Sequence, residues 1–278
     1  MIVIRRAQPQ HIPQMVRLWC SSFGDSEQFV QSFYEYWFPR SITFAALDGS
    51  TVAGIVHRLP ITVRMHGQSR KAYYLYAGGV DPDYRHRGIF RALLAEIFTI
   101  CRRENRPAFQ IPAEESLVPY YKSIGFRPLP VCREAKLDPP AQTDAEAVFT
   151  PLTAERFHAL RRQAADRLSC AAEWDTEALS YILRDHCAAG GFAYAVNTGG
   201  TEAAVLGRQH GDTLYLTELT ASAAQRGIIA GALCQRFSCA EVICRIPPED
   251  TEGSLRCGMF YPLPDFAPEQ CYLPIDLL

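Results

Sequence analysis

The sequence contains no apolar run near the roughly 20 residues that a membrane-spanning helix requires. It also lacks a charge excess, because 28 Lys and Arg residues stand against 30 Asp and Glu residues, a net charge of −2. This balance does not favour nucleic acid or an anionic membrane as a partner. The start of the chain, residues 1–6, is typical of a strand and lacks the order of a signal peptide.

Paired cysteine motifs are missing too, although the chain holds ten cysteines. No two of them have the two-residue spacing of a zinc knuckle, so we predict no metal site. Scattered thiols of this kind usually pack as small hydrophobic residues. Reduced cysteines are typical of the cytoplasm, and we predict a cytoplasmic protein.

What the sequence does have is enough apolar residues for a substantial core. Its 278 residues are 48% hydrophobic, which suits one large domain or two ordinary ones. The stretch 138–144 is polar and rich in Pro, which predicts a linker. We therefore expect a first domain over residues 1–137 and a second over residues 145–278.

A strand, a basic turn and a helix are predicted between residues 73 and 104. The aromatic run 73–76 favours a strand, and the double glycine after it indicates an end or a bulge. From Gly88 onward the apolar residues recur at helical spacing. The first amides of a helix have no partner inside it, carry about half a positive charge, and readily bind phosphate. Arg85 and Arg87 add guanidinium groups suited to phosphate oxygens.

This turn resembles the acetyl-coenzyme A signature Arg/Gln-x-x-Gly-x-Gly/Ala of the GNAT superfamily of N-acetyltransferases. Arg85 and Gly88 match it, whereas Phe90 stands where a small residue is usual. Two-region acetyltransferases of the "enhanced intracellular survival" type tolerate that departure, and the chain resembles them over most of its length. Those proteins usually end in a sterol-carrier-like domain, which we expect to be incomplete here.

The resemblance implies which residues bind acetyl-CoA as co-substrate. The strand before the turn would hold the pantetheine arm and the thioester through its main-chain amides. The turn itself would hold the diphosphate, largely through main-chain amides. The implied residues are Gly78, Gly79 and Val80 for the pantetheine arm and Arg85, His86, Arg87, Gly88, Ile89 and Phe90 for the diphosphate.

Tyr121 begins a segment, ending at Phe126, that resembles the Tyr-x-x-x-Gly-Phe segment of the same family. In the family this Tyr lies near the cofactor sulfur, which implies that Tyr121 protonates the leaving thiolate. A phenol of pKa about 10 keeps its proton at neutral pH and can act as a general acid. The alternative is that Tyr121 only packs its helix.

The base that takes a proton from the attacking amine is not identified by any motif. Glu114 and Glu115 are candidates, although an acidic helix start that complements the dipole is the simpler interpretation. The resemblance adds the C-terminal carboxylate of Leu278. His57 has an ordinary pKa near neutrality, but a lone His on a strand is more often structural.

The fold expected from the element order is α/β (α+β), built from tandem GNAT-like folds. Each would have a mixed, mostly antiparallel central sheet flanked by helices. The second half repeats the pattern of the first, with Arg226-Gly227-Ile228-Ile229 aligned to the basic turn. Arg85 then aligns with Ala224 and Tyr121 with Leu255, so we expect the second copy to lack the chemical residues.

The function predicted is acetyl-CoA-dependent N-acetyl transfer to a primary amine of a small molecule or peptide, by direct attack. The alternative is a non-catalytic acyl-CoA-binding sensor or scaffold module, and a longer acyl group also stays open. The aromatic residues of the helix predicted at 26–38 either pack in the core or line an acceptor pocket. Assembly into a homo-oligomer stays open.

Overall fold

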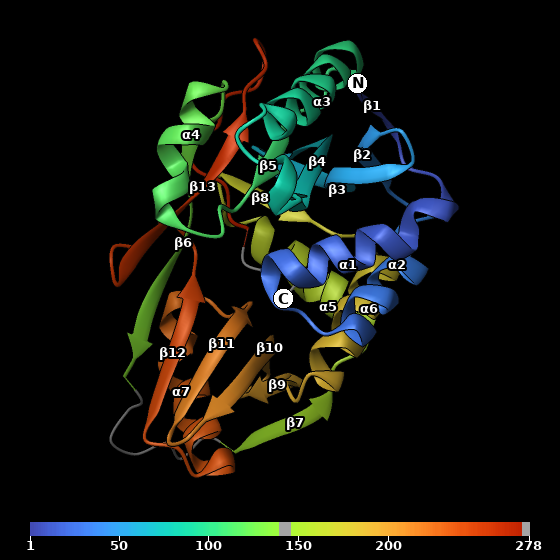
Figure 1. Ribbon diagram of the computed structural model, residues 1–278. Helices are drawn as coiled ribbons and strands as arrows, with labels where there is room; N and C mark the ends of the chain where they lie inside the picture. The colour runs from blue at the N-terminus through green and yellow to red at the C-terminus, as the bar shows by residue number, and fades with distance from the viewer. Residues whose placement is uncertain (139–145, 274–278) are drawn as a thin grey trace. The chain divides into compact units, whose positions relative to one another are not determined.

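The computed structural model describes residues 1–138 and 146–273, and these form two compact units (Figure 1). Unit 1 consists of Met1–Thr62, Lys71–Pro128 and Gly258–Ala267. Unit 2 consists of Val63–Arg70, Leu129–Cys257 and the described residues from Pro268 onward. Most of the predicted linker and the candidate carboxylate of Leu278 lie outside the described residues.

Unit 1 has a mixed sheet in the strand order β1-β2-β3-β4-β5-β13. The pairs β1/β2, β2/β3 and β5/β13 are antiparallel, and β4/β5 is parallel. The elements are β1 (Ile2–Arg6), α1 (Ile12–Phe23), α2 (Glu27–Trp37), β2 (Ile42–Asp48), β3 (Thr51–Met65), β4 (Gln68–Val80), α3 (Ile89–Glu104), β5 (Ala108–Gln110), α4 (Val118–Ser123) and β13 (Ser254–Tyr261).

The two faces of this sheet bury different kinds of side chain. On one face, α3 packs the fully buried Leu93, Leu94 and Ile97 against apolar residues of β2, β3 and β4. On the other face, α1 and α2 contribute aromatic rings, and the ring centroids of Trp19 and Phe33 lie 4.7 Å apart. The alternation of side chains along each strand separates the two sets, because neighbouring residues point to opposite faces.

Unit 2 repeats this arrangement, with the strand order β6-β12-β11-β10-β9-β7. The pair β11/β12 is parallel and the other four pairs are antiparallel. The elements are β6 (Arg127–Leu137), β7 (Ala147–Pro151), α5 (Ala154–Ala165), β8 (Cys170–Glu173), α6 (Thr176–Ala188), β9 (Phe192–Thr198), β10 (Thr201–His210), β11 (Thr213–Leu219), α7 (Ala223–Phe237) and β12 (Glu241–Ile246). The predicted mixed, mostly antiparallel sheets flanked by helices are confirmed.

The compact units differ from the predicted division of the chain. Strand β6 lies within the predicted first domain, yet most of it belongs to unit 2, where it pairs with β12. Strand β13 lies in the predicted second domain, yet its last four residues, from Gly258, belong to unit 1 and pair with β5. Each unit therefore completes its sheet with a strand from the other half of the sequence. The division into 1–137, 138–144 and 145–278 stays a prediction about sequence-contiguous domains.

Candidate active site

The tip of α3 is an open row of main-chain donors. Gly88 caps the helix in the left-handed conformation, at φ 73°, and a Cβ added there would meet nothing within 4 Å. The first intrahelical bond is donated by the amide of Ala92 to the carbonyl of Gly88, at 3.0 Å. Among residues 1–138 and 146–273 the amides of residues 86–91 have no acceptor. The tip is thus free to bind an anion.

The two predicted arginines lie beside this tip. Arg85 Nε donates to the carbonyl of Val80 at 3.3 Å, and Arg87 Nη2 donates to the carbonyl of Asp83 at 2.7 Å. Both side chains are exposed. One hydrogen bond each therefore holds these guanidinium groups near the tip.

Strand β4 bends where it parts from β5. The two strands pair at Tyr73 with Ala108 and at Tyr74 with Phe109, and β5 ends one residue later. Beyond that point β4 becomes half-buried, and Ala77 has a φ of 43°. The double glycine predicts that a glycine takes the unusual backbone angle, but the positive φ belongs to Ala77.

Gly78 and Gly79 are required because neighbouring side chains pack closely against them, and not because of an unusual backbone angle. A Cβ on Gly78 would lie 2.6 Å from the ring of Phe90, and one on Gly79 would lie 3.1 Å from Ser22 Oγ. Glycine at position 78 therefore makes room for the large Phe90. The ring of Phe90 also stacks on Tyr120, with centroids 6.3 Å apart and an interplanar angle of 23°.

Tyr121 is a buried phenol on α4, with its ring 6.3 Å from that of Phe90. Burial raises the pKa of Tyr121 to about 12, and the neighbouring Tyr120 adds to the shift. The Gln110 side chain acts to lower this pKa. The Nε2 atom of Gln110 has no hydrogen-bond partner among the described residues. Tyr121 therefore holds its proton across the physiological range.

Gln110 is a polar group that sequence reasoning missed. It ends β5, is only 5% exposed, and leaves its Nε2 without a partner among the described residues. A buried unpaired donor is costly unless a ligand completes it. No motif marks Gln110. The available signal was a polar residue closing the apolar strand Ala108-Phe109.

The candidate bases differ in their surroundings. Glu114 and Glu115 are exposed, and Glu114 accepts a bond of 3.0 Å from Ser116 Oγ. His57 is fully buried, with Nδ1 3.1 Å from the carbonyl of Tyr76 and Nε2 2.9 Å from the hydroxyl of Tyr34. Burial lowers the pKa of His57 to about 4, so the ring is neutral and enclosed.

The aromatic residues predicted on the second helix pack in the core of unit 1. Phe33, Tyr34 and Trp37 are each no more than 3% exposed. Their rings join Trp19 on α1, and Tyr76 lies 5.5 Å from Phe33 between centroids. This favours the core interpretation for these three side chains.

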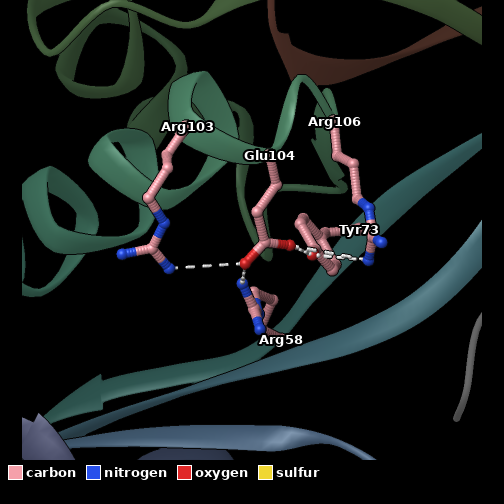
Figure 2. Close-up of polar contacts among 5 residues, drawn as sticks. All are labelled: Arg58, Tyr73, Arg103, Glu104 and Arg106. Carbon is pink, nitrogen blue, oxygen red and sulfur yellow. Dashed lines mark hydrogen bonds and ion pairs between the residues drawn. The ribbon is translucent and has the colours of Figure 1, made fainter.

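The far end of α3 is anchored to the strands by an ionic cluster around Glu104 (Figure 2). The Arg58 guanidinium lies 3.8 Å from Glu104, and its central carbon is 4.1 Å from the Tyr73 ring centroid. The Tyr73 hydroxyl donates to Glu104 and accepts from Arg106 Nη1 at 2.9 Å. Because Arg58 is on β3 and Tyr73 on β4, the cluster fixes the helix against the strands of the site.

Opposing effects set the pKa of Glu104. Burial acts to raise this pKa, whereas the hydrogen bond from Tyr73 and the charges of Arg58 and Arg106 lower it. The lowering effects prevail, and the pKa of Glu104 lies below its ordinary value. Glu104 is therefore a carboxylate at neutral pH.

The corresponding helix tip in unit 2 has fewer open donors, because the amides of Gln225 and Arg226 donate to the carbonyl of Ser222 at 2.9 and 3.2 Å. Gln225 Oε1 accepts from the Ser222 amide at 3.3 Å and from the Ser222 hydroxyl at 2.8 Å. Arg226 Nη2 is paired with Asp250 Oδ2 at 2.9 Å. The tip of α7 thus has a shorter row of open donors than the tip of α3.

Comparison with known families decides the kind of domain. Residues 3–129 match a family model described as an acetyltransferase (GNAT) domain. This stretch is a GNAT acetyltransferase domain. The predictions of the GNAT family and of an acetyltransferase are confirmed. No curated protein sequence matches the chain.

Solved structures show the same fold over nearly the whole chain. A probable N-acyltransferase from Enterococcus faecalis V583 is 13% identical, with a TM-score of 0.73 over 94% of this chain and 72% of that chain. A GCN5-related N-acetyltransferase from Kribbella flavida is 15% identical, with a TM-score of 0.72 over 94% and 70%. Eis1 from Mycobacterium abscessus is 15% identical, with a TM-score of 0.67 over 90% and 67%. The resemblance to the enhanced intracellular survival type is confirmed for the fold.

No helix in residues 1–138 and 146–273 is both long and apolar enough to cross a bilayer. Within the same described ranges, no three His, Cys, Asp or Glu side chains gather as a metal site would require.

Proposed function

We propose that unit 1 transfers an acetyl group from acetyl-CoA to a primary amine of a small molecule or peptide. The observation that carries this proposal is the open row of amides at the tip of α3, which fits a diphosphate. Gly88 permits its close approach, and Arg85 and Arg87 add charge beside it. The pantetheine arm would lie along Gly78–Val80, where β4 has parted from β5.

The chemistry needs a proton donor near the sulfur. Acetyl-CoA would supply an acetyl thioester, whose carbonyl carbon is attacked by the acceptor amine while the carbon–sulfur bond breaks. Tyr121 donates its phenolic proton to the departing sulfur, the attacking nitrogen releases one proton to solvent as the amide forms, and the phenolate takes one proton back from solvent. Gln110 Nε2, otherwise unpaired, donates to the phenolic oxygen as that oxygen becomes negative.

The proposal is tested by incubating the full chain with acetyl-CoA and a panel of amines, polyamines, aminoglycosides and peptides. Release of free thiol that depends on the amine supports acetyl transfer. Tight binding of CoA without thiol release for any amine would favour the alternative, a CoA-binding sensor or scaffold. The tandem origin of the two units, a cytoplasmic location and the oligomeric state stay predictions.

The arginines beside the tip provide a prediction about binding. Replacing both Arg85 and Arg87 with Ala is expected to weaken CoA binding roughly tenfold, because two charge-assisted contacts to phosphate are lost. Calorimetry measures this dissociation constant. A pantetheine derivative without the diphosphate should bind the variant and the wild type equally.

The control for this pair is Arg127→Ala, which removes an exposed charge from the same unit. Its CoA dissociation constant should match the wild type. Equal weakening by Arg127→Ala, or weakened pantetheine binding by the double variant, would contradict a specific diphosphate contact.

Gln110 provides a prediction about turnover. Gln110→Met keeps the size of the side chain but removes the donor, so kcat should fall about tenfold while CoA affinity is unchanged. Steady-state thiol release and calorimetry measure the two quantities. Gln110→Glu, which also lacks a donor when ionised, should be at least as slow. Full turnover in both variants would exclude the proposed contact.

A further inference from the structure

Ala77 adopts an unusual backbone conformation directly before the strand edge 78–80 of the candidate site. Its φ is 43°, in the left-handed region that residues other than glycine rarely enter. Such strained residues persist only where their surroundings hold them in place, and they are frequent at functional sites. Ala77 lies where β4 bends away, directly before the strand edge 78–80 that would face the thioester.

The group that holds this bend is the imidazole of His57, on the neighbouring strand β3. His57 Nδ1 lies 3.1 Å from the carbonyl oxygen of Tyr76, the residue before Ala77. A carbonyl can only accept, so Nδ1 carries the proton and Nε2 is the acceptor. The hydroxyl of Tyr34, 2.9 Å away on α2, donates to Nε2.

The surroundings leave this ring little freedom. His57 has no exposed surface, and its ring centroid lies 5.0 Å from that of Trp19 and 5.2 Å from that of Phe33. Tyr34 is 3% exposed. Both ring nitrogens are engaged and neither reaches solvent, so His57 does not act as the base for an acceptor amine.

We propose that Tyr34 and His57 form a buried relay that positions the bend of β4 for catalysis. In this relay the Tyr34 hydroxyl donates to the His57 imidazole, which in turn donates to the Tyr76 carbonyl. By fixing that carbonyl it stabilises the positive φ of Ala77, and so directs the amides that follow toward the thioester. Both are positioning residues, and their effect on turnover rests on the proposed acetyl transfer.

The test compares His57→Leu, which removes the donor, with His57→Gln, whose amide can still donate to the Tyr76 carbonyl. His57→Leu is expected to lower kcat at least tenfold, with the dissociation constant of CoA within twofold of the wild type. His57→Gln should recover a large part of the turnover. Tyr34→Phe, which removes only the outer hydroxyl, gives a second variant with an expected severalfold loss if His57→Leu does not fold.

The matched control is His186→Leu in unit 2. His186 is also buried, and its Nε2 lies 3.0 Å from the carbonyl of Gly207, but the residue has no part in the site. Turnover of this variant should equal that of the wild type. A loss of kcat as large as that of His57→Leu would show a general effect of altering a buried histidine and would overturn the proposal.

A crystal structure of His57→Leu, or of Tyr34→Phe, gives a readout independent of activity. The expected result is that Ala77 returns to a negative φ. If Ala77 relaxes while the wild-type protein transfers no acetyl group, the relay stands and the proposed function falls. If Ala77 keeps its positive φ and kcat is unchanged, the relay is overturned and acetyl transfer is unaffected.

Discussion

Tyr121→Phe is expected to lower kcat for acetyl transfer by roughly 100-fold or more, the range for losing a general acid. The phenol is buried and its pKa is raised to about 12, so the wild-type group remains protonated at neutral pH and can donate its proton. The affinity for CoA should change less than about twofold, because the proposed role of the hydroxyl is in the transfer step and not in binding the diphosphate. Steady-state thiol release and calorimetry with CoA measure the two effects.

Tyr120→Phe is the control for this change, because it removes a hydroxyl from the adjacent residue of the same helix. The ring of Tyr120 stacks on Phe90, and Phe preserves that contact. Turnover should therefore remain close to the wild type. If Tyr121→Phe were as active as Tyr120→Phe, Tyr121 would only pack its helix, and the CoA-binding alternative would gain support.

Glu104→Gln is expected to destabilise the protein by about 2 kcal/mol, somewhat less than the cost of removing one partner of a fully buried ion pair, because Glu104 is partly exposed. Arg58 is only 6% exposed and would keep its charge without the carboxylate beside it. Figure 2 shows that Glu104 also accepts from Tyr73, so the variant weakens the anchor between α3 and the strands. Denaturation in guanidinium, followed by circular dichroism, measures the free energy of unfolding.

The pH dependence of this effect has a definite sign. The pKa of Glu104 is lowered in the folded protein, so its stabilisation is fully present above the ordinary value of 4.5. It is lost as the pH falls through the lowered pKa. The difference in unfolding free energy between wild type and Glu104→Gln should therefore shrink on acidification below about pH 4.5.

Two further variants keep this prediction specific. Glu96→Gln changes an exposed carboxylate on the same helix and should alter stability by less than about 0.5 kcal/mol. Arg58→Met combined with Glu104→Gln removes both charges, and should be more stable than Glu104→Gln alone. Equal stability of Glu104→Gln and Glu96→Gln would contradict a structural role for the cluster.

The tip of α3 could be predicted from the sequence because all of its parts are local. A strand, a turn with two arginines, a glycine and a run at helical spacing occur within about twenty residues. Intrahelical hydrogen bonding then requires that the first amides stay free. The structure shows this tip, with Gly88 in the left-handed conformation and open space around it.

The bend of β4 could not be assigned correctly in the same way. A double glycine is the usual sign of a bend, yet here the positive φ falls on Ala77. His57 and Phe90 explain the difference, since one binds the preceding carbonyl and the other takes the space above Gly78. Both contacts join residues that are distant along the chain, and no local pattern contains them.

The sequence by itself determined the order of elements, the helical faces, the GNAT resemblance and the open tip of α3, because hydrophobic period and helix ends act over a few residues. The tertiary structure alone decided three things: the burial of Gln110 beside Tyr121, the contact of His57 with the bend, and the strand that completes each sheet. These depend on which distant segments pair and on which polar groups are left without partners. Packing and long-range hydrogen bonding determine these three features, and the spacing of residues along the sequence does not predict either.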